Sequence, residues 1–163
     1  MPDIDIRPLD PAGVAGAAAW AAQQLRPMPA YISHGEILSG RSPDGKRWAD
    51  DLDTVLARDF AACLEGGGFV LVAYRGSSIA GLCAVALESA AGTCIATIED
   101  LLVGEDGRGH GLGSRLIEAA ETLCHESNAD RIMLESGIAN DRAHSFFEAR
   151  GYRAVSKVFL REQ

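Results

Sequence analysis

The sequence predicts a single α/β domain over residues 1–163, in which helices cover both faces of a mixed, mostly antiparallel sheet. Three strand-like segments, at 69–74, 79–87 and 93–103, follow one another closely, and the first two are apolar almost throughout, as is typical of strands buried on both faces. A helical segment and a further buried run, 132–134, come next. This run can return parallel to the preceding strand through a right-handed crossover.

The segments before these three strands are predicted to form a short strand and two helices with a loop between them. Ile4 and Ile6 alternate with charged residues, which predicts a short half-buried strand. An alanine-rich helix is expected from Pro11 to Leu25, and a second helix over 46–65, where apolar residues recur at three- and four-residue spacing. The intervening 26–45 contains several prolines and glycines and is predicted to be a loop.

After the three strands, the sequence predicts two more helices and a final strand region in addition to the buried run 132–134. The periodicity of apolar residues predicts a helix over 112–127, and a shorter one over 141–150 that ends at Gly151. The segment 152–160 is expected to supply one or two final strands.

Composition excludes several classes of protein. The net charge of −8 argues against a nucleic-acid partner, because no basic stripe is available to replace the counterions of a phosphate backbone. The four cysteines are widely spaced and no histidine cluster accompanies them, so we expect reduced thiols and no metal site. Without an apolar leader or a run of membrane-spanning length, the protein is expected to be cytoplasmic, with no membrane partner.

A glycine-rich loop joins the strand ending at Val103 to the helix that begins near Leu112. Its glycines stand at every second position from 107 to 113. Free N–H groups of the first helical turn point into such a loop, and the missing Cβ atoms let an anion approach closely, which predicts a phosphate site. A P-loop does not fit because His110 stands where lysine is required, and a dinucleotide fingerprint does not fit because Ser114 takes the place of its third glycine.

The pattern Arg108-x-x-Gly111-x-Gly113 resembles the acyl-CoA pyrophosphate loop of the GCN5-related N-acetyltransferase (GNAT) family. The run 98–103 resembles the fourth strand of that family, and 140–152 its second motif, N-x-x-A-x-x-[FL]-Y-x-x-x-G-[FY]. The resemblance covers essentially the whole chain. It implies the GNAT fold, with the fourth and fifth strands parallel and splayed apart, and acetyl-CoA as the co-substrate.

The resemblance also assigns contacts with acetyl-CoA. The pyrophosphate would lie on the backbone of 108–114, and the pantetheine arm would run along the fourth strand. The residues assigned to acetyl-CoA are Leu101, Leu102, Val103, Arg108, Gly109, His110, Gly111, Leu112, Gly113, Ser114, Asn140 and Phe147. Homodimers are common in the family, although nothing in this sequence demands one.

The sequence departs from the family at Phe147, where the family usually has a tyrosine that donates a proton to the CoA sulfur. Phenylalanine has no such proton, although its ring can still pack against the pantetheine. Water, His144, Ser145 or Tyr152 is left as the candidate proton donor.

Two acidic residues are candidates for catalysis. An alkylamine with a pKa of about 10 is protonated at neutral pH and needs a general base. Glu99 is the preferred base, since it resembles the glutamate at this place in polyamine-type members of the family, and Asp100 is the alternative because a bulge could exchange their positions. The pair could instead bind a cationic substrate. Tyr31, His34 and Glu36, in the loop that lines the acceptor pocket in this family, are candidate substrate contacts.

The sequence therefore predicts an enzyme that transfers an acetyl group from acetyl-CoA to a primary amine of a small molecule. One alternative is an acetyltransferase that acts on a lysine side chain or an N-terminal amine of a peptide or protein. Another is a non-catalytic module that binds acyl-CoA as a sensor, which the phenylalanine at position 147 makes conceivable.

Overall fold

The computed structural model describes residues 3–163 and contains a five-stranded sheet with the spatial order β1-β2-β3-β4-β5. The strands are β1 (Ile4–Pro8), β2 (Phe69–Arg75), β3 (Ser78–Ala90), β4 (Thr93–Val103) and β5 (Arg131–Leu134). Neighbouring strands are antiparallel from β1 to β4, whereas β4 and β5 are parallel. The predicted mixed sheet with parallel fourth and fifth strands is confirmed.

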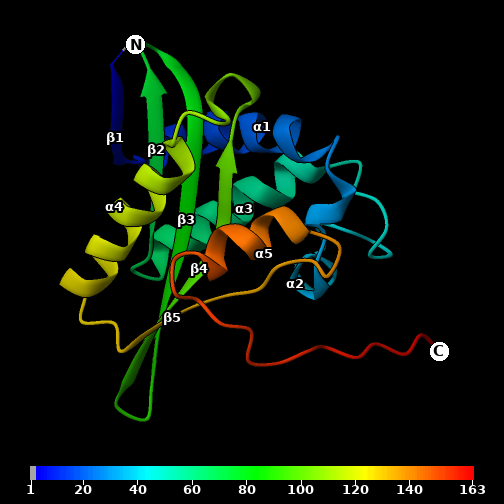
Figure 1. The fold of residues 1–163 in the computed structure, drawn as a ribbon. Coiled ribbons are helices and arrows are strands. Elements are labelled where there is room, and N and C mark those ends of the chain that lie inside the picture. The colour runs from blue at the N-terminus through cyan, green and yellow to red at the C-terminus, as the bar shows by residue number, and fades with distance from the viewer. Residues whose placement is uncertain (1–2) are drawn as a thin grey trace.

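Helices cover both faces of this sheet (Figure 1). The α-helices are α1 (Val14–Leu25), α2 (His34–Ser39), α3 (Leu52–Glu65), α4 (Leu112–Glu126) and α5 (Asp141–Glu148), and three 3-10 turns lie at Pro11–Gly13, Pro29–Tyr31 and Glu105–Gly107. One buried cluster joins α1 and α3 to the sheet through residues such as Leu25, Leu56 and Phe60. A second joins α4 to the opposite face through residues such as Leu116 and Ile117. No helix among the described residues is both long and apolar enough to cross a membrane.

A β-bulge at Glu99 decides which face each residue of β4 occupies. On β3, Val85 is opposite Ile98 whereas Ala84 is opposite Asp100, so Glu99 is an extra residue without a partner in the ladder. Ile98 therefore packs with the α4 cluster, while Leu102 packs with the α1 and α3 cluster. Without the bulge, Asp100 would share the face of Ile98.

The predicted loop 26–45 contains the short helix α2, which a capping box begins. The Ser33 side chain caps the Glu36 backbone, and the Glu36 carboxylate accepts a hydrogen bond from the Ser33 backbone N–H at 2.7 Å. The spacing of serine and glutamate is the usual sequence sign of such a helix start. The prediction of a plain loop was wrong because prolines and glycines around it obscured this sign.

The second helix begins later than predicted, at Leu52 instead of residue 46. The Asp44 side chain accepts hydrogen bonds from the backbone N–H groups of Lys46 and Arg47, at 2.9 and 3.0 Å. Such a local turn competes with helix formation. Trp48 is nevertheless buried, so its apolar side chain serves the core from an irregular segment.

The predicted final strand region, 152–160, does not form strands in the single chain. Gly151 has a φ of +88° and reverses the chain after α5, and Tyr152 then anchors it through a hydrogen bond from its hydroxyl to Glu121 at 2.8 Å. Beyond this point the chain forms no helix, strand or turn and pairs with no strand of the described sheet. A strand needs a neighbour to pair its backbone, and the single chain does not supply one here.

Candidate functional site

The edge of β4 that faces β5 is unpaired over its last five residues. Parallel pairing joins Ile95–Ile98 to Arg131–Leu134, and β4 continues from Glu99 to Val103 without a β5 partner. Backbone groups removed from water must find other partners. The two strands thus separate beside Leu101, where the sequence analysis places the pantetheine arm of acetyl-CoA.

Two side chains take the place of the missing strand. The Tyr31 hydroxyl accepts a hydrogen bond from the backbone N–H of Leu101 at 3.1 Å and donates one to its carbonyl oxygen at 3.2 Å. Arg108 donates from Nε to the carbonyl oxygen of Val103 at 3.2 Å. Burial, with the nearby Asp100 charge, raises the pKa of Tyr31, so its hydroxyl stays protonated and able to donate. The open edge is therefore satisfied by groups that a ligand could replace.

A cavity of about 680 Å³ runs along this open edge. Its lining residues come from the segments 27–31, 98–103, 107–114, 134–136 and 140–147. The volume falls in the range of cavities that hold small molecules and cofactors in proteins. This cavity extends from the separated strands to the glycine-rich loop.

The glycine-rich loop has the backbone conformation that glycine favours. Gly109 and Gly111 have φ values of +79° and +75°, and a Cβ added to either would meet no atom within 4 Å. The backbone angle, and not crowding, is thus the reason for glycine at these positions. Gly111 is the N-cap of α4, so the free N–H groups and positive dipole end of a 15-residue helix face this loop. The guanidinium of Arg150 adds a positive charge beside this loop, because it donates a hydrogen bond to the Ser114 hydroxyl.

A second cavity, of about 560 Å³, adjoins the first and is lined by many acidic residues. Its carboxylates are those of Glu36, Asp59, Glu88, Glu99 and Glu135. The two cavities share Ile98, Glu99 and Glu135 in their linings. Arg41 also lines the second cavity, but its charge is neutralised by ion pairs. A cationic ligand is therefore favoured there.

Glu99 lies at the junction of the two cavities. It is the bulge residue of β4, and its side chain has no hydrogen bond or ion pair with a described residue. Partial burial raises its pKa, and the negative charge of Asp100 raises it further, outweighing Arg41. A carboxyl with a raised pKa is a stronger base once it is ionised. Its position and chemistry suit it to take a proton from a group in the acidic cavity.

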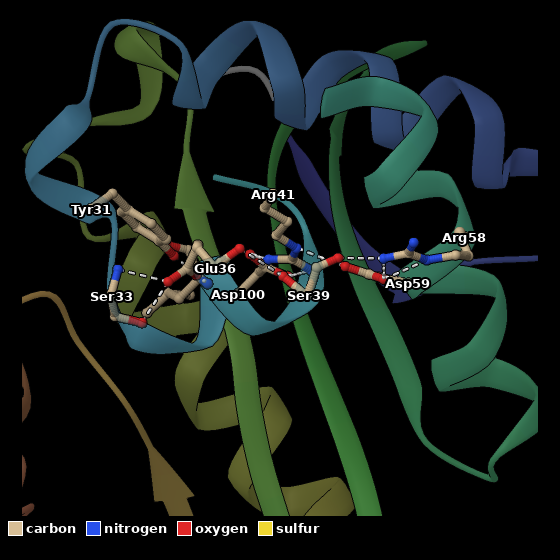
Figure 2. Close-up of polar contacts among 9 residues, drawn as sticks. Tyr31, Ser33, Glu36, Ser39, Arg41, Arg58, Asp59 and Asp100 are labelled. Atoms are coloured by element: carbon tan, nitrogen blue, oxygen red, sulfur yellow. Dashed lines mark hydrogen bonds and ion pairs between the residues drawn. The ribbon is translucent and has the colours of Figure 1, made fainter. Parts of the chain in front are cut away.

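Asp100, the alternative base, is instead part of a buried ion-pair network (Figure 2). Arg41 binds both of its carboxylate oxygens, from Nη1 at 2.8 Å and from Nη2 at 3.1 Å, and donates from Nε to Asp59 at 2.8 Å. Asp100 is only 1% exposed. The carboxylates of Asp59 and Asp100 both bind the buried Arg41 guanidinium, so Asp100 is held in the interior by this network. Of the two neighbouring acidic residues, only Glu99 is exposed.

Most predicted site residues line one of the two cavities, but two histidines do not. His110 and His34 line neither cavity, and Nδ1 of His34 lies within hydrogen-bond distance, 3.1 Å, of a carboxylate oxygen of Glu135. Of the candidate substrate contacts, Tyr31 lines the first cavity and Glu36 lines the second.

The second sequence motif contributes to the wall of the first cavity. Asn140 accepts a hydrogen bond from the Ala143 backbone N–H at 3.3 Å and so caps α5, while Phe147 stacks edge-on with Tyr152. Of the alternative proton donors, His144 forms a hydrogen bond with the carbonyl oxygen of Gly137, and the Tyr152 hydroxyl donates one to Glu121 of α4. Their polar atoms are engaged away from the cavities.

Sequence reasoning missed the residues that reach the site from distant segments. Arg41 and Asp59 gave no local signal, because only the fold brings them to β4. Gly137 also went unnoticed: a Cβ there would lie 2.5 Å from the carbonyl oxygen of Ile32 and 2.7 Å from that of Ala30. Only glycine allows the segment after β5 to pack this closely against the segment that carries Tyr31.

Comparison with known proteins gives one family. The sequence model described as "Acetyltransferase (GNAT) family" matches residues 35–152. Among curated protein sequences, none matches this chain.

Similar solved structures include three acetyltransferases. An acetyltransferase of Trypanosoma brucei is 17% identical with a TM-score of 0.68, and the match covers 99% of this chain and 100% of the other. A predicted acetyltransferase of Clostridium acetobutylicum, solved with acetyl-CoA, is 16% identical with a TM-score of 0.73, covering 98% and 96%. The aminoglycoside N-acetyltransferase AAC(6')-Iy, solved with CoA, is 13% identical with a TM-score of 0.71, covering 99% and 95%. At such low identity these likenesses establish the fold alone.

Proposed function

This chain belongs to the GNAT family of acetyltransferases, and we propose that it transfers the acetyl group of acetyl-CoA to a primary amine of a small cationic molecule. The observation that carries the proposal is the position of Glu99, at the junction between a cavity along the open edge of β4 and a cavity lined by carboxylates.

The first cavity suits the donor. The backbone amides of the glycine-rich loop and the N-terminus of α4 favour the pyrophosphate, and Arg150 adds positive charge beside Ser114. Backbone groups of Leu101 and Val103, now capped by side chains, are available to the amides of the pantetheine arm. The residues present therefore fit acetyl-CoA.

The second cavity suits a cationic acceptor. Glu88 and Glu99 line it without pairing with a described residue, while its basic side chain, Arg41, is already bound by Asp59 and Asp100. Aminoglycosides are polycationic amines, and a structural neighbour is named as an aminoglycoside N-acetyltransferase. That likeness is compatible with a cationic substrate, and the carboxylates of this chain are the stronger support.

The chemistry requires a neutral amine and a proton for the departing thiolate. The amine nitrogen attacks the thioester carbonyl carbon, a C–N bond forms, and the C–S bond breaks with its electron pair on sulfur. Glu99 takes the amine proton, directly or through water. Phe147 supplies no proton to the thiolate, so solvent water supplies it in this proposal.

The direct test measures thiol release from acetyl-CoA with a panel of amines: polyamines, aminoglycosides, monoamines of matched size and lysine peptides. We expect turnover with the multiply charged small amines and a lower KM for them than for the monoamines. Turnover only with lysine peptides would favour a protein acetyltransferase. Calorimetric binding of acetyl-CoA without turnover on any amine would favour the sensor.

A second prediction concerns the Tyr31 hydroxyl. Its hydrogen bonds to Leu101 exist only before the donor takes their place, so they stabilise the free protein against the complex. Losing them in Tyr31→Phe is worth about 0.5–1.5 kcal/mol, which lowers the Kd for acetyl-CoA about 2- to 10-fold in calorimetry. Tyr152→Phe is the matched control, because that hydroxyl bonds Glu121 outside both cavities and its loss leaves the Kd unchanged. Weaker binding by Tyr31→Phe would mean that the hydroxyl contacts the bound donor.

A further inference from the structure

The hydroxyl of Ser136 is buried and has no hydrogen-bond partner among the described residues. Ser136 lies in the segment that joins β5 to α5 (Figure 1), and it lines the first cavity. A buried hydroxyl without a partner has lost its hydrogen bonds to water, and such groups are rare in native proteins. Serine has a single side-chain torsion, so the hydroxyl can turn toward an acceptor that enters the cavity. A ligand with such an acceptor would give Ser136 the partner that the free protein lacks.

The two neighbours of Ser136 are held by hydrogen bonds, which fixes where its side chain lies. Before it, the Glu135 carboxylate accepts a hydrogen bond from the backbone N–H of Gly35 at 3.1 Å. After it, the Gly137 carbonyl oxygen accepts one from the backbone N–H of Asn140 at 2.9 Å. The structure thus fixes the position of Ser136 and leaves its hydroxyl free, an arrangement that suits a preorganised binding group.

The register of the parallel strands places Ser136 across the gap from the proposed base. The last pair joins Ile98 of β4 to Leu134 of β5, after which the strands separate. Glu99 lies one residue past this pair in the sequence, and Ser136 lies two residues past it in the segment that follows β5. During acetyl transfer the acyl carbon is bonded to both the amine nitrogen and the sulfur. A group that serves the sulfur must therefore lie near the base, as Ser136 does.

The other hydroxyl groups in the wall of the first cavity are already engaged. The Tyr31 hydroxyl exchanges two hydrogen bonds with the β4 backbone, and the Ser114 hydroxyl accepts one from a guanidinium at the glycine-rich loop. Ser145, the serine considered from the sequence, is exposed and lines neither cavity. Among the described residues that line this cavity, Ser136 therefore has the one hydroxyl without a partner.

We propose that the Ser136 hydroxyl donates a hydrogen bond to the sulfur of acetyl-CoA and stabilises the thiolate as it leaves. This inference rests on the acetyl transfer proposed above. As the C–S bond breaks, its electron pair stays on sulfur, and Ser136 keeps its own proton because a serine hydroxyl is a far weaker acid than a thiol. Solvent water then protonates the thiolate. Ser136 thus offers the hydrogen bond that Phe147 cannot.

The pKa of the bound CoA thiol tests this contact without turnover. The complex with CoA is titrated while the ultraviolet absorbance of the thiolate is followed, and the complex with desulfo-CoA, in which hydrogen replaces the thiol, is subtracted to remove ionisations of the protein. Ser136→Ala is expected to raise the pKa of the bound thiol by about 1–2, since a hydrogen bond to a charged sulfur is lost. Ser136→Thr keeps a hydroxyl and should stay near the wild-type value. Ser127→Ala, exposed at the end of α4 and outside both cavities, is the control.

Kinetics and stability separate this role from a structural one. Ser136→Ala should lower kcat about 10- to 100-fold, the factor expected when a hydrogen bond to a charged group is lost. Its Kd for desulfo-CoA should be unchanged, because the lost contact is with sulfur alone. Urea denaturation of the free protein should show no loss of stability, since the hydroxyl has no partner there.

Three results would overturn the proposal. The first is an unchanged pKa of the bound thiol in Ser136→Ala. The second is a rise of that pKa in Tyr31→Phe instead, which would assign the contact to Tyr31. The third is a loss of stability in Ser136→Ala typical of a broken hydrogen bond. A protein that acetylates no amine would contradict the proposed function, whereas the thiol pKa would still decide whether Ser136 bonds the sulfur.

Discussion

Glu99→Gln is expected to lower kcat about 10²- to 10⁴-fold at neutral pH, the range usual for loss of a general base. Glutamine keeps the size and polarity of the side chain but cannot accept the amine proton. Glu99 lies at the junction of the two cavities without a partner among the described residues, so its loss breaks no structural contact. The measurement is thiol release under saturating acetyl-CoA and amine. Glu118→Gln, on the exposed face of α4, is the control and keeps full activity.

The pH profile gives the same residue an independent signature. Burial and the Asp100 charge raise the pKa of Glu99, so the acidic limb of kcat/KM should lie above the usual glutamate value of about 4.3. Glu99→Gln should remove that limb and recover part of its activity at high pH, where the amine is neutral without help. An acidic limb that persists in the variant would assign the base to another group.

The same pKa shift predicts how Glu99 affects stability. Because its folded pKa is raised, the native state binds the proton more tightly than the unfolded chain does. The contribution of Glu99 to folding stability therefore increases as the pH falls through the folded pKa, and the ionised form is mildly unfavourable at neutral pH. Glu99→Gln should consequently lose activity without losing thermal stability.

Arg41→Met should destabilise the fold by about 3–5 kcal/mol, the cost typical of leaving a buried charge unpaired. Arg41 holds both oxygens of Asp100, which is 1% exposed, and without it that carboxylate has no counter-ion in the interior. Urea denaturation of the free protein measures the loss. Arg7→Met, which breaks the exposed pair with Asp5, is the comparison and should cost no more than about 1 kcal/mol.

A double variant separates an unpaired charge from lost packing. In Arg41→Met with Asp100→Leu both charges of the buried pair are absent, and most of the stability should return. A loss below about 1 kcal/mol in Arg41→Met alone would show that the network is dispensable. A double variant as unstable as the single one would show that packing of the Arg41 side chain dominates.

The sequence predicted what depends on local pattern. Apolar periodicity located the main strands and helices, and the glycines from 107 to 113 located the helix N-terminus that faces the first cavity. Glu99 and Asp100 were both identified as candidates, but their different positions depend on a one-residue register shift against β3. A shift of this kind is set by the packing of two strands and has no signature in one of them.

What the sequence could not predict depends on contacts between distant segments. Tyr31 bonds Leu101 across 70 positions of the chain, and Arg41 reaches Asp100 across 59. The segment 152–160 is a different case: its apolar pattern predicted one or two strands, and the structure forms none there. A pattern specifies that a segment can pair, but it does not supply the partner strand that its backbone groups require.

The bulge at Glu99 has a consequence for how this protein can evolve. The extra residue leaves Glu99 without a partner on β3 and moves Asp100 to the face where Arg41 binds it, so the two positions are under different selection. Position 99 is constrained by the proposed proton transfer and not by the fold, because its side chain has no partner among the described residues. Position 100 can change only together with position 41, since each buried charge requires the other. Homologues that catalyse the same reaction should therefore keep a base at position 99, whereas positions 41 and 100 should covary.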